Sequence, residues 1–303
     1  MDILFAIDAG TTGVRTLAVD LDGRVLDVSY RPLTQHFPSP GFVEHDGTEI
    51  VRLVIETLSE AALRAEARGE RVVTIGLTNQ RETTIAFDRA TGTPLAKAIV
   101  WQDRRTADAC DAWRSDGVES LVRSTTGLVL DPYFSATKMS WLLGEGVGKG
   151  ATQLALSTID SWVLWNLTGG ASGGVYATDP SNASRTMLFD LSTGTWSEEM
   201  AQIFGVPLEA LATISPSAGR FGLVSGSVVP SLAGVPISGV IGDQQGALFG
   251  QACFEAGMAK ATYGTGSFVL QNIGTTLPGP AEGLTTSVAW QLGEQAPLTY
   301  ALE

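Results

Sequence analysis

The sequence has few cysteines and no long hydrophobic run. Only two Cys occur among 303 residues, Cys110 and Cys253, and they form no CxxC pair. This spacing excludes a disulfide framework and a Cys-based zinc site, and it is most simply explained by a reducing compartment. The chain does not begin with a basic, apolar leader, and no apolar run approaches the roughly 18 residues of a spanning helix. We therefore expect a cytoplasmic protein without a membrane span.

Charged residues are also sparse, at 17 % of the chain, and the net charge is −13. A chain this acidic is poorly suited to hold a nucleic-acid backbone or an anionic membrane, so neither is expected as a partner. A local phosphate site is still compatible with this charge, because backbone N–H groups bind anions. Hydrophobic residues at 44 % and 35 glycines are typical of an α/β enzyme with many tight turns.

Three familiar nucleotide-binding patterns are missing. The sequence contains no GxxxxGK[ST], and its Gly-rich segment 144–150 lacks the Ser or Thr that would follow Lys149. No GxGxxG follows a predicted strand, and the protein-kinase signatures are absent. A phosphoryl-transfer site in this chain must therefore be built from other residues.

The hydrophobic pattern predicts alternating strands and helices. Two successive hairpins are expected at the N-terminus, and Asp46 is expected to cap a helix reaching about residue 68, with Glu49 completing a capping box. The predicted strands are 3–7, 14–20, 25–30, 72–77, 83–87, 96–101, 235–241, 258–263 and 268–272. The other predicted helices are 106–114, 118–124, 135–143, 157–167 and 246–253.

A carboxylate and a small-residue turn follow the first predicted strand, in Asp8-Ala9-Gly10-Thr11-Thr12. Such a turn offers N–H groups and hydroxyls to phosphate oxygens, and Asp8 is suited to Mg²⁺ held through water. By itself the motif is more often an ordinary hairpin. The second strand–turn–strand copy around Gly264-Thr265-Gly266 indicates a duplicated core whose two loops clamp a polyphosphate.

Two polar clusters follow buried strands. Asp243 ends the run at 235–241, where a carboxylate is well placed as a general base for a hydroxyl. Helix capping is the alternative role, and the two are compatible. Arg81 and Glu82 follow the strand at 72–77 and together offer the donors and acceptors that a polyol needs. A surface ion pair is the alternative there.

Aromatic and imidazole side chains complete the candidates. Trp101 and Tyr133 stand beside polar or turn residues, and aromatic faces commonly wall small-molecule pockets. Core packing explains them equally well. His36 and His45 lie in a loop without metal or triad spacing, so structural roles are expected for both.

Motifs along the whole chain resemble the glycerol-phosphorylating members of the FGGY carbohydrate kinase family. The matching segments include 8–12, 41–46, 78–84, 99–102, 131–135, 182–189, 242–250 and 262–266, in the family's order. The resemblance implies an α/β, actin-like (ribonuclease H-like) fold with a mixed sheet and flanking helices. It also implies ATP-dependent phosphorylation of glycerol to sn-glycerol 3-phosphate, with Mg²⁺.

The resemblance also assigns roles by position. The substrate-binding residues it implies are Arg81, Glu82, Trp101, Tyr133, Asp243 and Gln244. Those expected to contact the ATP phosphates are Thr11, Thr12, Gly13, Arg15, Gly264 and Thr265. Asp243 is implied as the base, and Asp8 and Asp243 as the surroundings of the metal. Gly13 departs from the Ser common in the family, which removes a hydroxyl from the phosphate loop.

The resemblance further implies two domains, of which the second is incomplete. We expect residues 1–250 to form an N-terminal, substrate-binding FGGY domain and 251–303 to begin a truncated C-terminal one. The fragment alone is then expected to be impaired, and the full-length protein to be a homo-oligomer. Two alternatives stay open at this point: an FGGY kinase for another polyol or a pentulose, and a non-catalytic actin-like module.

Overall fold

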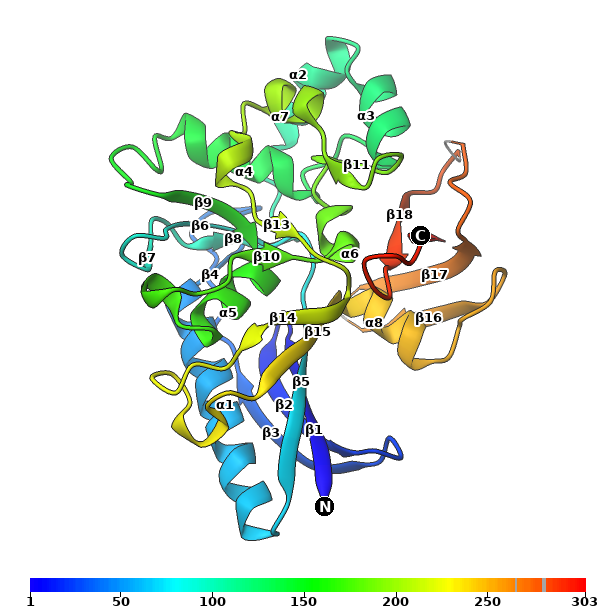
Figure 1. Cartoon of the computed structure of the whole chain (residues 1–303). Coiled ribbons are helices and arrows are strands. Elements are labelled where there is room, and N and C mark those ends of the chain that lie inside the picture. The colour runs from blue at the N-terminus through cyan, green and yellow to red at the C-terminus, as the bar shows by residue number, and fades with distance from the viewer. Residues whose placement is uncertain (265, 280–281) are drawn as a thin grey trace.

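A six-stranded mixed sheet forms the lower part of the molecule in Figure 1. The computed structural model describes residues 1–264, 266–279 and 282–303. The strands of the sheet are, in spatial order, β14 (Ala218–Leu223), β15 (Pro236–Gly242), β5 (Arg71–Asn79), β1 (Asp2–Ala9), β2 (Gly13–Asp20) and β3 (Val25–Pro32). Strands β1, β2 and β3 are two successive antiparallel hairpins, as predicted, whereas β5 and β15 run parallel to β1. This arrangement is the mixed sheet of the actin-like fold expected above.

Helix α1 (Gly47–Ala67) covers one face of this sheet (Figure 1). Asp46 caps it as predicted, since its carboxylate accepts hydrogen bonds from the backbone N–H groups of Thr48 and Glu49. The Glu49 carboxylate does not return to the cap but accepts from Thr34 and Arg52 instead, so the capping box is only half formed. The apolar stripe of α1 packs with the inward side chains of β1 and β5 into the main core.

A second, largely helical layer lies above the sheet in Figure 1. Helix α5 (Ile159–Leu167) packs beside α1 against β5 and β15, with the short helix η1 (Gly170–Ser172) next to it, and η3 (Pro230–Leu232) contacts α1, so these three belong with the six-stranded sheet. The layer above contains α2 (Ala107–Ser115), α3 (Glu119–Thr126), α4 (Ser135–Gly144), α6 (Pro180–Ala183), α7 (Glu198–Phe204) and the short helix η2 (Leu208–Ala210). Its sheet joins β4 (Glu44–His45), β8 (Ala98–Ile99), β6 (Thr84–Asp88), β7 (Thr93–Pro94) and β9 (Leu154–Thr158). Two short ribbons pair β10 (Ala177–Thr178) with β13 (Thr213–Ile214), and β11 (Phe189–Asp190) with β12 (Thr195–Trp196).

This layer corrects two predictions. The helix expected at 157–167 begins only at Ile159, because 154–158 forms β9 instead. All five residues of β9 pair with β6, so the tertiary partner decides the conformation of this apolar stretch. The strand expected at 96–101 is reduced to β8, and the hairpin with β6 is split between β7 and β8.

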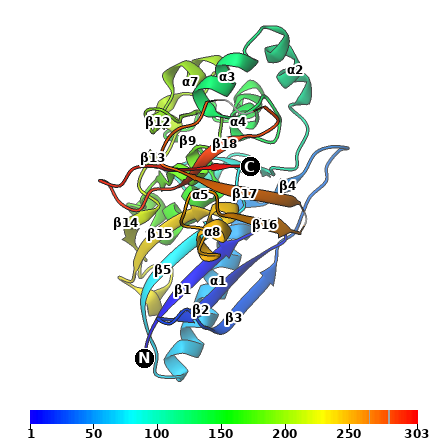
Figure 2. The same ribbon diagram turned by 90° about the vertical axis from the view of Figure 1, so that its right-hand side faces the viewer.

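A separate four-stranded antiparallel sheet holds the C-terminal part of the chain. Its order is β16 (Ala259–Tyr263), β17 (Ser267–Gly274), β19 (Thr299–Leu302) and β18 (Thr286–Trp290). Helix α8 (Asp243–Gly250) joins it to β15, and Figure 2 shows α8 between the two sheets. Leu248 of α8 packs with Leu270 and Trp290 of the smaller sheet in a cluster of its own.

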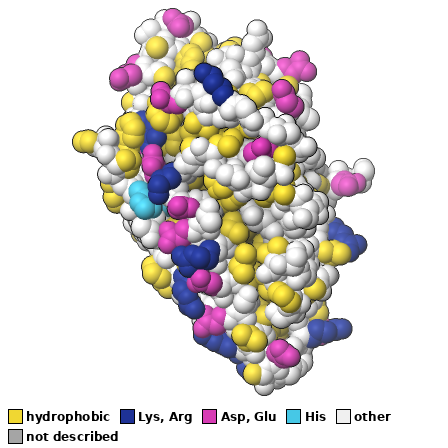
Figure 3. All heavy atoms as spheres, turned by 90° about the vertical axis from the view of Figure 1, so that its left-hand side faces the viewer, with side chains coloured by type: hydrophobic (Ala, Val, Ile, Leu, Met, Phe, Trp, Pro, Cys, Tyr) yellow, Lys and Arg dark blue, Asp and Glu magenta, His cyan; other side chains and the backbone are white. Residues whose placement is uncertain are grey.

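Charges of both signs alternate on the face shown in Figure 3. Along α1, Arg52 pairs with Glu56 at 2.7 Å, and Arg64 pairs with Glu60 one further turn on. Exposed helix pairs of this kind contribute little to stability. Within the described ranges, no helix is long and apolar enough to cross a membrane.

Candidate active site

The turn between β1 and β2 carries the first predicted cluster. Gly10 N–H donates to the Gly13 carbonyl at 3.1 Å and closes the turn. Asp8 is the last residue but one of β1, where its carboxylate lies 3.0 Å from the Arg15 guanidinium. Burial raises the pKa of the Asp8 carboxyl, and the charge of Arg15 offsets this only in part. The turn therefore presents one carboxylate and one guanidinium beside its backbone and hydroxyl groups.

Gly13 is required by close packing with β3. A Cβ at this position would lie 2.4 Å from the Tyr30 ring and 2.7 Å from the Arg31 carbonyl oxygen. The Tyr30 hydroxyl lies 3.4 Å from the Thr12 carbonyl, so the ring covers the turn. The Tyr30 ring of β3 thus occupies the space that a side chain at position 13 would need.

The turn between β5 and β6 holds Arg81 and Glu82 away from solvent. Their exposed fractions are 2 % and 1 %, so the alternative of a surface ion pair is wrong. Glu82 adopts a left-handed conformation with φ of 59°. A non-glycine residue pays strain for this conformation, which persists only where the surroundings fix it and is common at functional sites.

A residue that the sequence analysis missed holds Glu82 in place. Arg185, just after α6, donates from Nε to the Glu82 carboxylate at 2.7 Å and is itself 3 % exposed. Burial raises the pKa of Glu82, although the charges of Arg81 and Arg185 oppose that change. No sequence pattern links positions 82 and 185, because the contact depends on how α6 packs against the β5–β6 turn.

Asp243 is the first residue of α8. Gly242 occupies the N-cap position and no side chain caps the helix, so the capping role considered for Asp243 is not the one it has. Its Oδ1 lies 3.4 Å from Arg81 Nε, and 36 % of its side chain is exposed. The protein nevertheless encloses the carboxylate closely enough that desolvation raises its pKa, which Arg81 counteracts. A carboxylate of this kind is suited to accept a proton.

The neighbouring Gln244 brings a second unforeseen residue to the site. Its side-chain oxygen accepts a hydrogen bond from Lys260 of β16, whose ammonium also donates to Thr262 Oγ1 at 2.9 Å. Burial, with the charge of Arg81, lowers the pKa of Lys260 to about 8. Lys260 is 2 % exposed and joins the smaller sheet to α8.

Three aromatic rings form one wall. Trp101 lies 5.6 Å from Tyr133 and 6.1 Å from Phe268 between ring centroids, both in edge-on contacts. The indole N–H of Trp101 donates to Thr11 Oγ1 at 2.9 Å and so links the wall to the β1–β2 turn. Burial raises the pKa of the Tyr133 hydroxyl. Phe268 was missed because nothing in an alternating strand marks which apolar side chain faces a site.

These elements enclose a cavity of about 250 Å³, which we call the polar pocket. It is lined by Asp8, Gly10, Thr11, Thr12, Gly13, Arg15, Arg81, Glu82, Trp101, Tyr133, Asp243, Gln244, Thr262, Gly264, Gly266 and Phe268. The structure thus brings every predicted site residue to one cavity except Thr265, which lies outside the described residues. Their chemical roles stay predictions.

The donors for a cation are two carboxylates in this pocket, Asp8 and Asp243. Within 1–264, 266–279 and 282–303, no group of three or more His, Cys, Asp or Glu is arranged to hold a metal ion. Mg²⁺ commonly uses one or two carboxylates and completes its shell with water and substrate phosphates. The two carboxylates therefore fit Mg²⁺ held jointly with a nucleotide, and not a metal site made by the protein alone.

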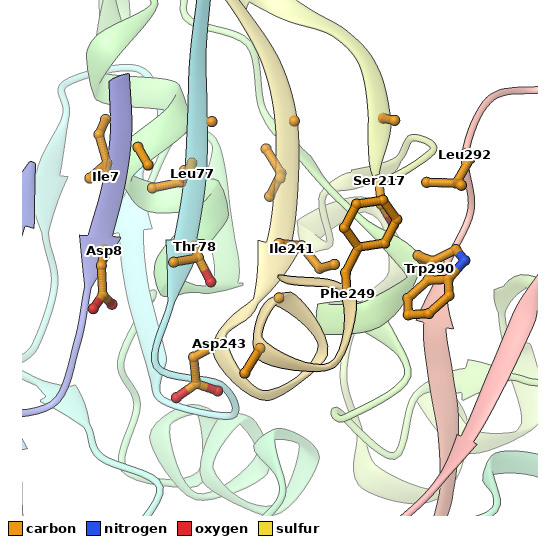
Figure 4. A pocket seen from close by; sticks show the side chains of 17 residues that line it. Ile7, Asp8, Leu77, Thr78, Ser217, Ile241, Asp243, Phe249, Trp290 and Leu292 are labelled. Carbon is orange, nitrogen blue, oxygen red and sulfur yellow. The ribbon is translucent and has the colours of Figure 1, made fainter. Parts of the chain in front are cut away.

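A second cavity, the apolar pocket, lies on the other side of Asp8 and Asp243 (Figure 4). Its volume is about 420 Å³, and it is lined by Ala6, Ile7, Asp8, Gly76, Leu77, Thr78, Ser217, Ala218, Gly239, Val240, Ile241, Asp243, Gly246, Ala247, Phe249, Trp290 and Leu292. Figure 4 shows the carboxylates of Asp8 and Asp243 at the same end of the strands. The hydroxyl of Thr78 is buried there and has no hydrogen-bond partner among the residues that the structure describes.

Comparison with known proteins gives one consistent family. Residues 3–250 match the model of the FGGY family of carbohydrate kinases, N-terminal domain. The glycerol kinases of Thermus brockianus and of Geobacter sp. (strain M21) are each 48 % identical to the chain over its full length. The chain spans 61 % of the length of either relative.

Solved structures agree. The crystal structure of Plasmodium falciparum glycerol kinase with ADP superposes with a TM-score of 0.93 at 34 % identity, covering all of this chain and 60 % of that one. A ligand-bound xylulose kinase from Lactobacillus acidophilus gives a TM-score of 0.87 at 18 % identity, again over the full chain and 59 % of its own length. The second likeness concerns the fold alone.

Proposed function

Because this chain belongs to the FGGY family of carbohydrate kinases, we propose that the protein transfers the terminal phosphoryl group of ATP to glycerol, yielding sn-glycerol 3-phosphate. The observation that carries the proposal is the polar pocket, in which Asp243 borders both the Arg81–Glu82 pair and the β1–β2 turn. A base between a polyol site and a phosphate site is what in-line transfer to a hydroxyl requires.

The substrate side of the pocket suits a short polyol. Arg81 supplies donors only and ionised Glu82 acceptors only, so together they satisfy hydroxyls that both donate and accept. Trp101, Tyr133 and Phe268 offer ring faces and edges to the carbon chain. The volume of about 250 Å³ has to accommodate the polyol and the reacting phosphate together, which favours a small acceptor.

The reaction needs one proton transfer and one phosphoryl transfer. Asp243 accepts the proton of the attacking hydroxyl as the new O–P bond forms and the bond to the ADP oxygen breaks. Arg15 and the N–H and hydroxyl groups of the β1–β2 turn hold the phosphate oxygens. Asp8 and Asp243 would hold Mg²⁺ together with ATP, and the ion would supply charge neutralisation at the phosphates.

We also propose that residues 1–250 form an N-terminal substrate-binding domain and that 251–303 belong to a C-terminal one. The match of 3–250 to the N-terminal domain of the family supports this boundary. The separate four-stranded sheet formed after residue 250 supports it as well. The homo-oligomer expected for the intact protein stays a prediction, for which light scattering is the measurement.

The experiment is ADP release by the intact protein with ATP, Mg²⁺ and each of glycerol, erythritol, xylulose and ribulose. We expect glycerol to give the highest kcat/KM. A pentulose preferred over glycerol would assign the chain to another substrate within the family. ADP release with none of the four would favour a non-catalytic actin-like module.

A further inference from the structure

We propose that Glu303 is a positioning residue for the transfer: its carboxylate fixes the Arg81 guanidinium so that the Nε edge of Arg81 faces Asp243. This inference rests on the proposed function. Glu303 lies just after β19 in the smaller sheet and does not line the polar pocket. It therefore acts on the substrate site through Arg81 and not by contact with the reacting atoms.

The contact between Glu303 and Arg81 is bidentate. Oε1 of Glu303 accepts from Nη2 at 2.7 Å and Oε2 accepts from Nη1 at 3.0 Å. Two parallel bonds of this kind define the plane of the guanidinium as well as its position. Both groups are buried, since 1 % of the Arg81 side chain and 11 % of the Glu303 side chain are exposed.

This pairing decides what Arg81 presents to the site. With both terminal nitrogens directed at Glu303, and Nη1 also donating to Gln245 Oε1 at 3.3 Å, the Nε edge is the part left near the other two carboxylates. Nε lies 3.4 Å from Asp243 and 3.7 Å from Glu82, distances too long for strong bidentate pairs. Asp243 thus has a cation nearby without being locked to it, and it keeps the capacity to accept a proton.

Glu303 is itself held from two sides. Its Oε2 lies 2.8 Å from Nη1 of Arg185, and its backbone exchanges two hydrogen bonds with Thr285. Arg185 also binds Glu82, so a single carboxylate from the smaller sheet links the two guanidiniums that flank the substrate pair. The four-stranded sheet and the β5–β6 turn are connected at the wall of the pocket, and not only through apolar packing.

Removing the charge of Glu303 leaves Gln245 Oε1, 3.3 Å from Nη1, as the remaining acceptor of the terminal nitrogens of Arg81. The nearest remaining carboxylates are Asp243 and Glu82, so the guanidinium is expected to turn toward them. A closer pair with Asp243 occupies the carboxylate that is to accept the proton of the attacking hydroxyl. The same rotation removes Arg81 from its polyol-facing position.

The test compares Glu303→Gln with Glu294→Gln in the intact protein. Glu294 lies in the same C-terminal region, is exposed, and undergoes the same chemical change. For Glu303→Gln we expect kcat to fall roughly 10- to 100-fold and the KM for glycerol to rise. Glu294→Gln is expected to match wild type in both.

A role confined to folding would lower the active fraction without changing the KM for glycerol. A wild-type KM for glycerol in folded Glu303→Gln would therefore overturn the inference. If that variant does not accumulate as folded protein, Glu303→Asp decides, because it keeps the charge and shortens the reach by one methylene. A raised KM for glycerol supports the inference there, and a wild-type KM overturns it.

One further measurement separates this inference from the proposed function. The guanidinium N–H signals of Arg81 are followed by ¹⁵N NMR in wild type and Glu303→Gln, which requires no turnover. Loss of separate, slowly exchanging Nη signals of Arg81 in the variant supports the positioning role even if glycerol is not the substrate. Unchanged Arg81 signals contradict it even if glycerol is phosphorylated well.

Discussion

The polar and apolar pockets share Asp8 and Asp243 but differ in almost everything else. The polar pocket contains ionised side chains joined by long-range hydrogen bonds, whereas the apolar pocket is bordered mainly by the side chains and backbone of β1, β5, β15 and α8. The larger cavity is the apolar one, at about 420 against 250 Å³. Cavity size is therefore a poor guide to chemistry in this protein, and the arrangement of charge is the better one.

The largest effect should come from the carboxylate that both pockets share. Asp243→Asn keeps the shape and removes the base, so we expect kcat to fall by roughly 10²- to 10⁴-fold while much of the glycerol affinity is kept. Single-turnover phosphoryl transfer and glycerol binding are the measurements. Asp111→Asn is the control, because Asp111 is 74 % exposed in a surface ion pair. A loss of less than about tenfold would contradict the role of Asp243 as base.

The pH profile tests the same residue without a mutation. Burial raises the pKa of Asp243 above its ordinary value of 3.8, and a base acts only when deprotonated. Activity is therefore expected to fall as the pH is lowered through this raised pKa. Glu303 does not titrate in that range, since burial raises its pKa but Arg185 and Arg81 outweigh burial and hold it at about 2. A limb at or below the ordinary Asp value would show that Asp243 is not the group observed.

Stability should depend on the ion network behind the polar pocket. Arg185→Met leaves Glu82 and Glu303 without one of their two guanidiniums, and removing one partner of a buried pair typically costs about 3–5 kcal/mol. The measurement is the free energy of unfolding from urea titration. Arg104→Met is the matched control, because its ion pair with Asp131 is largely exposed and contributes less than about 1 kcal/mol. Equal losses in the two variants would contradict the special position of Arg185.

A smaller effect is expected at the aromatic wall. Trp101→Phe removes the donor to Thr11 Oγ1, a hydrogen bond that contributes about 1 kcal/mol. We expect the KM for ATP to rise by roughly fivefold, since the β1–β2 turn is less well fixed. Trp196→Phe removes an equivalent donor, to the Ala212 carbonyl, at a site outside the polar pocket. It should therefore leave the KM for ATP unchanged, and a rise in both variants would count against the link.

The smallest effect belongs to the apolar pocket. Thr78→Val replaces a buried hydroxyl that has no partner in the described part of the chain, so stability should stay the same or rise by less than about 1 kcal/mol, with no change in kcat. Thr74→Val on the same strand is the contrast, because the Thr74 hydroxyl donates to Ser238 Oγ at 2.7 Å. Thermal unfolding of the two variants measures the difference. A large loss of kcat in Thr78→Val would mean that the apolar pocket takes part in the reaction.

Residues close in sequence could be predicted well. The β1–β2 turn, the Asp46 cap and the runs that became β5 and β15 depend on neighbours a few positions away, and the structure confirms them. The segment at 154–158 could not be predicted, because an apolar run of this length is compatible with strand or helix until β6 pairs with it. For the β1–β2 turn, the Asp46 cap and the two strands, by contrast, the local pattern and propensity were enough to predict the structure.

The sequence by itself determined which chemistry was available: a carboxylate after each of two buried strands, an Arg–Glu pair after a third, and a Gly-Thr turn. Only the tertiary structure decided which groups meet. Glu82 pairs with Arg185 across 103 positions, and Arg81 pairs with Glu303 across 222. Such contacts carry no local signature, since they arise when sheet order and helix packing bring distant strand ends together. The physical cause is burial, because a charge removed from water is stable only beside a partner that the fold supplies.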